Sequence, residues 1–194
     1  MKLKILLSAM LLLLLVWLYS PASYSQNPTC TVTLTNDTLI GNAWSFDVYI
    51  LRTGTTPFNL YTFQIGLTYD NGAKNDGTIT AVWSNIDSAI VAAGNIPNPT
   101  NVLTAGVIKC SSALPIGGLA SDTFPEMSNV GFGTHYGTLT VTNSVPWTGL
   151  PQFTWCFNSE QYPTRIRAVV NGLTVDVTSI GTFIKGPLKS SGLK

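Results

Sequence analysis

Alternation of apolar and polar residues is the dominant pattern of this chain. In residues 44–51, the apolar side chains of Trp44, Phe46, Val48 and Ile50 alternate with Ser45, Asp47, Tyr49 and Leu51. Residues 61–69 repeat the pattern with Tyr61, Phe63, Ile65, Leu67 and Tyr69. Successive side chains of a strand point to opposite sides of its sheet, so a period of two predicts strands. We expect two antiparallel strands, each with one buried face.

Strand-like patterns recur along the chain, and helical patterns are nearly absent. Seven further strand candidates are 30–34, 78–83, 106–111, 137–142, 153–157, 165–170 and 173–177. The best helical candidate, 84–93, is short. About nine short strands separated by turn residues predict an all-β protein, an antiparallel β-sandwich or jelly roll. The irregular sections 94–101 and 113–135 would then be loops at one end of the sandwich.

The first residues have the pattern of a secretory signal peptide. Lys2 and Lys4 precede an apolar run over residues 5–18, and small Ser23 and Ser25 precede a cleavage point before Gln26. This run of fourteen residues, which includes Ser8, is also short for a bilayer span, which needs roughly 20. We therefore predict a signal peptide over 1–25, no retained membrane span, and a secreted or cell-surface protein.

The composition indicates one domain with little surface charge. Charged residues make up 10% of the chain, against about a quarter in typical soluble proteins. Removing Lys2 and Lys4 with the signal peptide leaves eight bases against nine acids, so we expect no nucleic-acid partner. We divide the mature chain into a β-sandwich over 26–180 and a flexible tail or linker start over 181–194, where Gly, Ser and Lys replace the alternation.

Three cysteines would enter an oxidising compartment, where at most one disulfide can form within the chain. Alternation places Cys30 and Cys110 on inward faces and Cys156 on the outward face with Thr154. A Cys30–Cys110 bond is then the only pairing that the strand faces permit. The preferred interpretation is that all three are small buried or half-buried residues without a bond.

Residues for catalysis are scarce. His135 is the single histidine, and no Gly-x-Ser-x-Gly motif accompanies it. Glu126 and Glu160 are the only glutamates, and the seven aspartates fall mainly in turns or on outer strand faces. We predict no enzyme and name no catalytic residue. A hydrolase is the residual alternative; a glycoside hydrolase needs two carboxylates across a cleft, and this chain offers few candidates for such a pair.

An oxygen-rich segment over 70–77 has some likeness to a calcium loop. It contains Asp70, Asn75 and Asp76, but the spacing differs from that of an EF-hand and Lys74 adds a positive charge. We interpret it as a turn, with a calcium site at these three residues as the alternative. No other cofactor is expected.

Aromatic residues are the better candidates for a binding surface. Flat exposed rings stack on other planar apolar groups, including the apolar faces of sugars, at low entropic cost. Trp44 and Trp155 lie on apolar faces and are expected in the core. The candidate ligand-binding residues are Trp147, Tyr49, Tyr136 and Tyr162, with Trp147 in a loop and Tyr49 on an outer face as the leading two.

Several segments together resemble a known kind of module. They are 46–60, 63–69, 77–80, 137–143, 153–155 and 162–164. They look like a β-sandwich of secreted and surface proteins of Bacteroidota-type bacteria, similar in outline to the cohesin and cellulose-binding sandwich group. The resemblance covers roughly residues 31–177 and lies in framework residues, so it implies no catalytic residue. Its cohesin half implies a protein partner, and its cellulose-binding half implies a polysaccharide.

Taken with the residues, the resemblance predicts an exported, non-catalytic binding or adhesion module. An extracellular glycan is the first candidate ligand. The alternative is a structural or protein-docking role, in which an outer patch around Tyr49 and Leu51 meets a surface protein.

Overall fold

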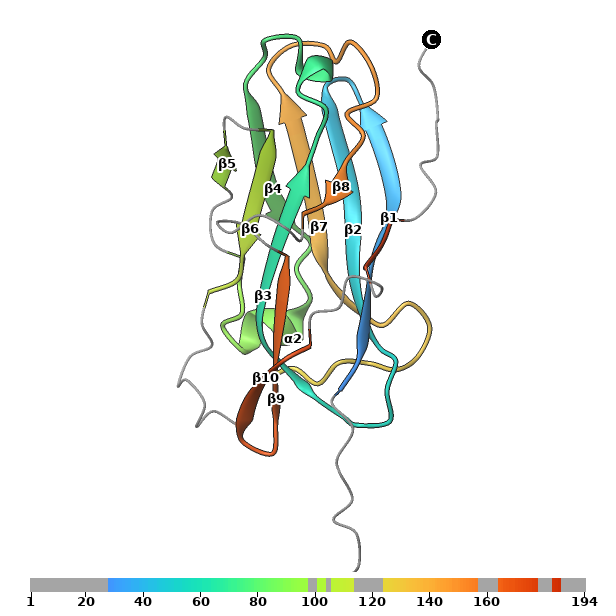
Figure 1. Cartoon of the computed structure of the whole chain (residues 1–194), viewed down its shortest axis with the longest axis vertical. Coiled ribbons are helices and arrows are strands. Elements are labelled where there is room, and N and C mark those ends of the chain that lie inside the picture. Colours follow the sequence, from blue (N-terminus) through green and yellow to red (C-terminus); the bar gives the residue numbers. More distant parts are fainter. Residues whose placement is uncertain are drawn as a thin grey trace, which may run out of the picture.

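The protein is a sandwich of two β-sheets (Figure 1). The computed structural model describes residues 28–97, 101–103, 106–113, 124–156, 164–177 and 183–185. The first sheet, called sheet A here, has the order β11 (Phe183–Lys185), β1 (Cys30–Ile40), β2 (Ala43–Arg52), β7 (Thr134–Asn143) and β4 (Ile79–Ser84). Sheet B has the order β10 (Leu173–Asp176), β9 (Arg165–Val170), β3 (Asn59–Thr68), β6 (Val107–Ser111) and β5 (Asn101–Leu103), and β8 (Thr154–Trp155) also pairs with β3.

The predicted fold class is confirmed. Each of the nine predicted strand segments contains a strand, and the all-β sandwich is the architecture of the described residues. Two strands of three residues, β5 and β11, were not expected from the sequence. The helix α2 spans Ser88–Ala92 inside the predicted helical segment, and its N-cap Asp87 accepts a hydrogen bond from the Ala89 N–H at 2.7 Å. Among the described residues, no helix is long and apolar enough to cross a membrane.

The core lies between the two sheets and is built from the alternating apolar faces. In β2, every second residue from Trp44 to Ile50 is buried. Phe153, which precedes β8, packs edge-on against Phe46 with ring centroids 5.0 Å apart. Burial of a side chain of this size contributes about 1.5–3 kcal/mol. The predicted core positions of Trp44, which is 3% exposed, and of half-buried Trp155, which packs against the core, agree with this arrangement.

Asn and Gly close two of the tight turns. Asn171 and Gly172 both have positive φ values, 50° and 76°, and connect β9 to β10 in a two-residue hairpin. That turn needs φ above zero at both positions, which Asn-Gly tolerates. The β1–β2 hairpin turns at Gly41 and Asn42, where Ile40 pairs with Ala43.

The last described strand differs from the prediction for the C-terminal segment. Residues 181–194 were expected to form a loose tail, but Phe183–Lys185 pair in parallel with Val32–Leu34 at the edge of sheet A. Three residues of the predicted tail therefore form an edge strand of sheet A. The backbone hydrogen-bonding groups along the free side of β1 explain this addition, because an unpaired sheet edge accepts a further strand.

Candidate functional site

The outer face of sheet A brings together a carboxylate, polar donors and aromatic rings. Pairing places Asp47 of β2 between Thr35 of β1 and Thr138 of β7. Two residues further along β2, Tyr49 lies between Thr33 and His135. Phe46, Val48 and Ile50 point into the core. Asp47 and Tyr49 alternate with them along β2, so these two side chains and their partners on β1 and β7 point to the outer face. We call Asn36, Asp47, Tyr49, Phe132, His135 and Thr138 the Asp47–Tyr49 site.

Asp47 is fixed by donors from both neighbouring strands. Its Oδ2 accepts a hydrogen bond from Asn36 Nδ2 at 2.8 Å, and its Oδ1 accepts one from Thr138 Oγ1 at 2.7 Å. His135 Nε2 lies 3.5 Å from Oδ1, a distance of electrostatic contact rather than of a well-formed hydrogen bond. The Asp47 side chain keeps 23% of its surface exposed. A carboxylate has about four acceptor positions, so it retains capacity for a ligand.

A β-bulge in β1 places Asn36 beside this carboxylate. The register between β1 and β2 shifts between Thr35 and Thr38, so β1 contains one extra residue at that point. Asn36 takes the left-handed conformation there, with φ of 52°. Asn adopts this conformation more readily than most residues, and bulges commonly re-aim a side chain next to a functional site.

A second bulge, on the other side of β2, places His135. Val48 pairs with Gly137 and Tyr49 pairs with His135, so Tyr136 is the extra residue of β7. This shift turns the Tyr136 side chain into the core and the His135 side chain toward Asp47. Both bulges therefore serve the same stretch of β2.

Three rings form a continuous aromatic surface next to Asp47. The centroid of the Tyr49 ring lies 5.0 Å from that of His135 and 5.8 Å from that of Phe132. Phe132 is 66% exposed. These separations lie within the contact range of aromatic pairs. The site thus presents an apolar platform beside a hydrogen-bonding carboxylate.

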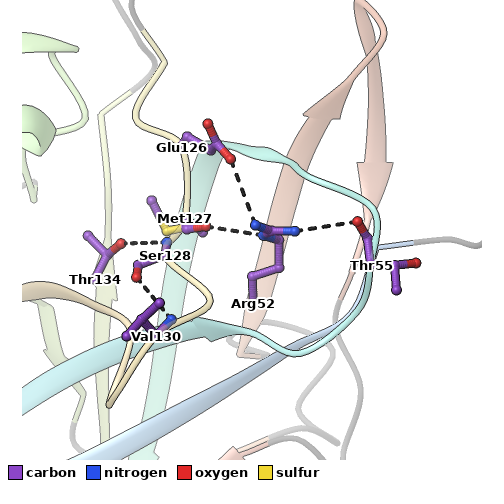
Figure 2. A network of polar contacts seen from close by, with 7 residues as sticks. All are labelled: Arg52, Thr55, Glu126, Met127, Ser128, Val130 and Thr134. Carbon is purple, nitrogen blue, oxygen red and sulfur yellow. Dashed lines mark hydrogen bonds and ion pairs between the residues drawn. The ribbon is translucent and has the colours of Figure 1, made fainter.

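The turn that carries Phe132 is held in place by polar contacts (Figure 2). Arg52, at the end of β2, donates from Nε to the Met127 carbonyl oxygen and from Nη1 to that of Thr55, both at 3.4 Å. Its Nη2 lies 3.9 Å from Glu126 Oε1. The loops around Thr55 and Met127 lie together at one end of the sandwich (Figure 1).

Ser128 continues the network into the turn itself. Its N–H donates to Thr134 Oγ1 at 3.0 Å, and its Oγ accepts from the Val130 N–H at 3.2 Å. Figure 2 shows both contacts at the base of the turn. The Gly133 N–H then donates to the Val130 carbonyl oxygen at 3.0 Å. Phe132 is therefore presented by a braced turn.

The environment of Asp47 favours its ionised form. Partial burial alone would raise its pKa, but the hydrogen bonds from Thr138 and Asn36 and the nearby His135 outweigh burial and lower the pKa below the ordinary value. The site therefore carries a negative charge at neutral pH.

The four predicted ligand-binding residues do not form one site. Tyr49 lies on the outer face, as predicted. Tyr136 does not, because the bulge in β7 places it in the core at 1% exposure, where its hydroxyl donates to the Asn95 carbonyl oxygen at 3.1 Å. Its ring has no face open to a ligand. Tyr162 lies outside the described residues.

Trp147 is far from Tyr49 and half-buried. Its Nε1 donates to the carbonyl oxygen of Asn42 at 2.9 Å, and its ring packs edge-on against Phe153 at 6.3 Å. Asn42 precedes Tyr49 by seven residues along β2, a separation of about 23 Å in a strand. Trp147 therefore covers the opposite end of the sandwich core, and it is not part of the Asp47–Tyr49 site.

The alternative interpretation of residues 70–77 was a calcium site at Asp70, Asn75 and Asp76. The described residues contain no group of three His, Cys, Asp or Glu side chains that could hold a metal ion. Asp70 Oδ1 accepts from the Gly72 N–H at 2.9 Å, and Asn75 and Asp76 both have positive φ values after the 3-10 helix η1 (Gly72–Lys74). These are the contacts of a turn, which was the preferred interpretation.

All three cysteines are free thiols in the structure. Cys30 and Cys110 point inward, as predicted, and they are not bonded, which agrees with the preferred interpretation. Cys156 is also buried, but unlike Cys30 and Cys110 it does not belong to the core cluster. β8 ends at Trp155, and the Cys156 N–H donates to the Gly66 carbonyl oxygen at 2.7 Å while its side chain is buried.

Sequence reasoning missed most of the Asp47–Tyr49 site. Asn36, Asp47, Phe132 and His135 were not predicted to act together. The outward position of Asp47 follows from the alternation in β2, so that residue could have been found. The two bulges had a weaker signal, namely the loss of alternation at Asn36-Asp37 and at Tyr136-Gly137. Of the carboxylates named for a hydrolase, Glu126 contacts Arg52, and Glu160 lies outside the described residues.

Comparison with known proteins gives a likeness among solved structures. No family model matches the chain, and no curated protein matches it. Among solved structures, it is similar to a cohesin module from a Clostridium perfringens ATCC13124 family 33 glycoside hydrolase. The two are 11% identical with a TM-score of 0.41, and the match covers 82% of this chain and 98% of that module.

Proposed function

We propose that this chain is an exported, non-catalytic module that binds an extracellular glycan at the Asp47–Tyr49 site. The observation that carries the proposal is the placement of a partly exposed carboxylate beside an aromatic platform on one open sheet face. Export rests on the signal-peptide pattern of residues 1–25.

The chemistry of the site suits a sugar ring. The exposed Phe132 and the adjoining Tyr49 offer flat apolar surface for the apolar face of a pyranose. The Asp47 carboxylate, already oriented by Asn36 and Thr138, can accept hydrogen bonds from sugar hydroxyls. Binding sites commonly combine apolar surface with a few such polar groups.

The surroundings of the site suit an extended chain of sugars. Outward hydroxyls continue from Asp47 along β2 and β7, where Ser45 Oγ lies 2.9 Å from Thr140 Oγ1. Thr142 pairs with Ala43 one step further. From Tyr49 to Ala43 the strand covers about 20 Å, which leaves room for more than one sugar unit.

The test is retention of the mature chain, from Gln26 onward, on insoluble or gel-embedded polysaccharides. Tyr49→Ala and Phe132→Ala are expected to weaken retention about 5- to 30-fold each, the equivalent of about 1–2 kcal/mol for a lost ring contact. Leu173→Ala is the matched control, because it removes an equally exposed apolar side chain from sheet B. Retention that is unchanged in both aromatic variants would contradict the proposal.

A protein-docking role is the second candidate, and one observation favours it. Val130 is 74% exposed on the same braced turn as Phe132, so the turn presents two apolar side chains to solvent. Solvated apolar tips of this kind are used in protein contacts. Val130→Ser would weaken protein docking and leave glycan retention unchanged, which separates the two candidates.

A further inference from the structure

We propose that Asp47 makes the site favour neutral glycans over chains that carry carboxylates or sulfates. This inference rests on the proposed function, because it concerns the ligand of the same site. The choice is between a neutral glycan and an acidic form of the same glycan, and it follows from the negative charge on the outer face of sheet A.

Among the described outward residues of β1, β2, β7 and β4, Asp47 is the one carboxylate, and none is a lysine or an arginine. The other described outward residues of β1, β2, β7 and β4 carry hydroxyl, amide, apolar, aromatic or imidazole side chains. They are Thr31, Thr33, Thr35, Asn36, Thr38 and Ile40 of β1, Ala43, Ser45, Tyr49 and Leu51 of β2, His135, Thr138, Thr140 and Thr142 of β7, and Thr80, Val82 and Ser84 of β4. A ligand that lies along β2 and β7 therefore meets one fixed negative charge and no lysine or arginine among these residues.

Three groups lie against Asp47, and two of them are neutral hydrogen-bond donors. The third, His135, has its Nε2 3.5 Å from Oδ1 and offsets the charge of Asp47 only when its imidazole is protonated. Its two hydrogen-bond donors are an amide, from Asn36, and a hydroxyl, from Thr138. Arg52 lies five residues further along β2, about 17 Å away in a strand, and its guanidinium is engaged by Glu126 and two carbonyl oxygens. Neutral donors stabilise the anion and leave its field directed at the solvent.

The distance between Tyr49 and Asp47 sets the size of the effect. Side chains two residues apart on a strand are about 6.6 Å apart, so an acidic sugar stacked on Tyr49 places its charge about that far from Asp47. Coulomb repulsion at this distance weakens binding about 3-fold in a water-like dielectric and about 70-fold at the effective dielectric of a protein surface. We expect a penalty on the order of tenfold for each acidic sugar at the platform.

The experiment compares polysaccharides that differ only in charge. A glucan, a mannan and a galactan are each used unmodified and after oxidation of their primary hydroxyls to carboxylates. The wild-type mature chain is expected to bind at least one neutral polymer and to bind its oxidised form about tenfold more weakly at low ionic strength. The difference should shrink with added salt, because salt screens charges at an exposed site. The salt series needs no variant and so does not depend on the folding of one.

Two variants separate the local charge from the net charge. Asp47→Asn keeps the shape of the side chain and removes its charge, so it should bring the oxidised polymer close to the neutral one. Asp176→Asn removes the same charge from exposed β10 of sheet B and should leave the difference unchanged.

The outcomes are distinct. If wild type binds neutral and oxidised polymers equally, or if Asp176→Asn narrows the difference as much as Asp47→Asn does, the selection by Asp47 is refuted while glycan binding stands. Retention of oxidised polymers alone would also refute it. If no polymer in either form is retained, the proposed function fails, and this inference fails with it.

Discussion

Gly133 offers the sharpest test of the turn that presents Phe132. Its φ is +94°, and a Cβ at this position would lie 2.5 Å from the Leu51 Cα and closer still to the Ile50 carbonyl oxygen. Both atoms belong to the backbone of β2, so no side chain can rotate away to make room. Gly133→Ala should therefore force the turn off the sheet or strain it in place.

The expected cost follows from two contributions. A non-glycine residue in the left-handed region costs about 1–2 kcal/mol, and overpacking against a rigid neighbour costs about 1–3 kcal/mol. Together they give about 2–5 kcal/mol. For a domain of 150–250 residues each kcal/mol lowers Tm by about 2–4 °C, so we expect a fall on the order of 10 °C.

Gly131→Ala is the matched control. Gly131 belongs to the same turn and also has a positive φ, +62°, but nothing lies within 4 Å of the point that a Cβ would occupy there. It should lose only the conformational contribution, a fall in Tm of about 4 °C. Thermal unfolding followed by circular dichroism measures both variants. If the Tm of Gly133→Ala falls no further than that of Gly131→Ala, then Gly133 does not lie as close to the β2 backbone as the structure places it.

Three further predictions concern single side chains. The pKa of Asp47 is lower in the folded state than in the unfolded chain. The ionised side chain therefore stabilises the fold above about pH 4, and this contribution is lost as pH falls through the folded pKa. Between about pH 5 and pH 2, the Tm of Asp47→Asn should fall less than the Tm of wild type. Tyr136→Phe removes the hydrogen bond to the Asn95 carbonyl oxygen and should lower the free energy of unfolding in a urea titration by about 1 kcal/mol. Glycan retention should be unchanged, and a loss of retention would place Tyr136 in the Asp47–Tyr49 site. Burial raises the pKa of the Cys30 thiol to about 12. Iodoacetamide at pH 8 should therefore leave Cys30 unlabelled in the native chain and should label it in denaturant without reductant. A Cys30 thiol that stays unlabelled in denaturant would indicate a disulfide.

The sheet framework could be predicted because local pattern decides it. In β2 the alternation from Trp44 to Ile50 states which residues enter the core, and the structure buries those residues. The same pattern predicted the outward position of Tyr49. β5 and β11 could not be predicted in this way, since strands of three residues are too short to show a period and exist only through pairing with β6 and β1.

The site was less predictable because its residues meet only through register. Asn36 and Asp47 come from adjacent strands, but His135 and Thr138 follow Asp47 by about ninety positions. No single-sequence pattern states which strand lies beside β2. Phe132 lies in a turn whose shape depends on Gly133 against β2 and on Arg52 from the end of that strand, so its exposure also required the tertiary structure.

The bulge in β7 explains why one predicted residue was misplaced and another was missed. Counting back from buried Leu139 in a regular strand would turn Tyr136 outward and His135 into the core. The extra residue reverses both: Tyr136 packs against Phe63 with ring centroids 4.7 Å apart, and His135 faces Asp47. A buried imidazole would cost more than a buried phenol with a hydrogen-bond partner, so the bulge is favoured by the core, and the position of His135 on the open face follows from it. The same irregularity thus stabilises the sandwich and assembles the binding surface, because a one-residue shift in a strand moves side chains between its two faces.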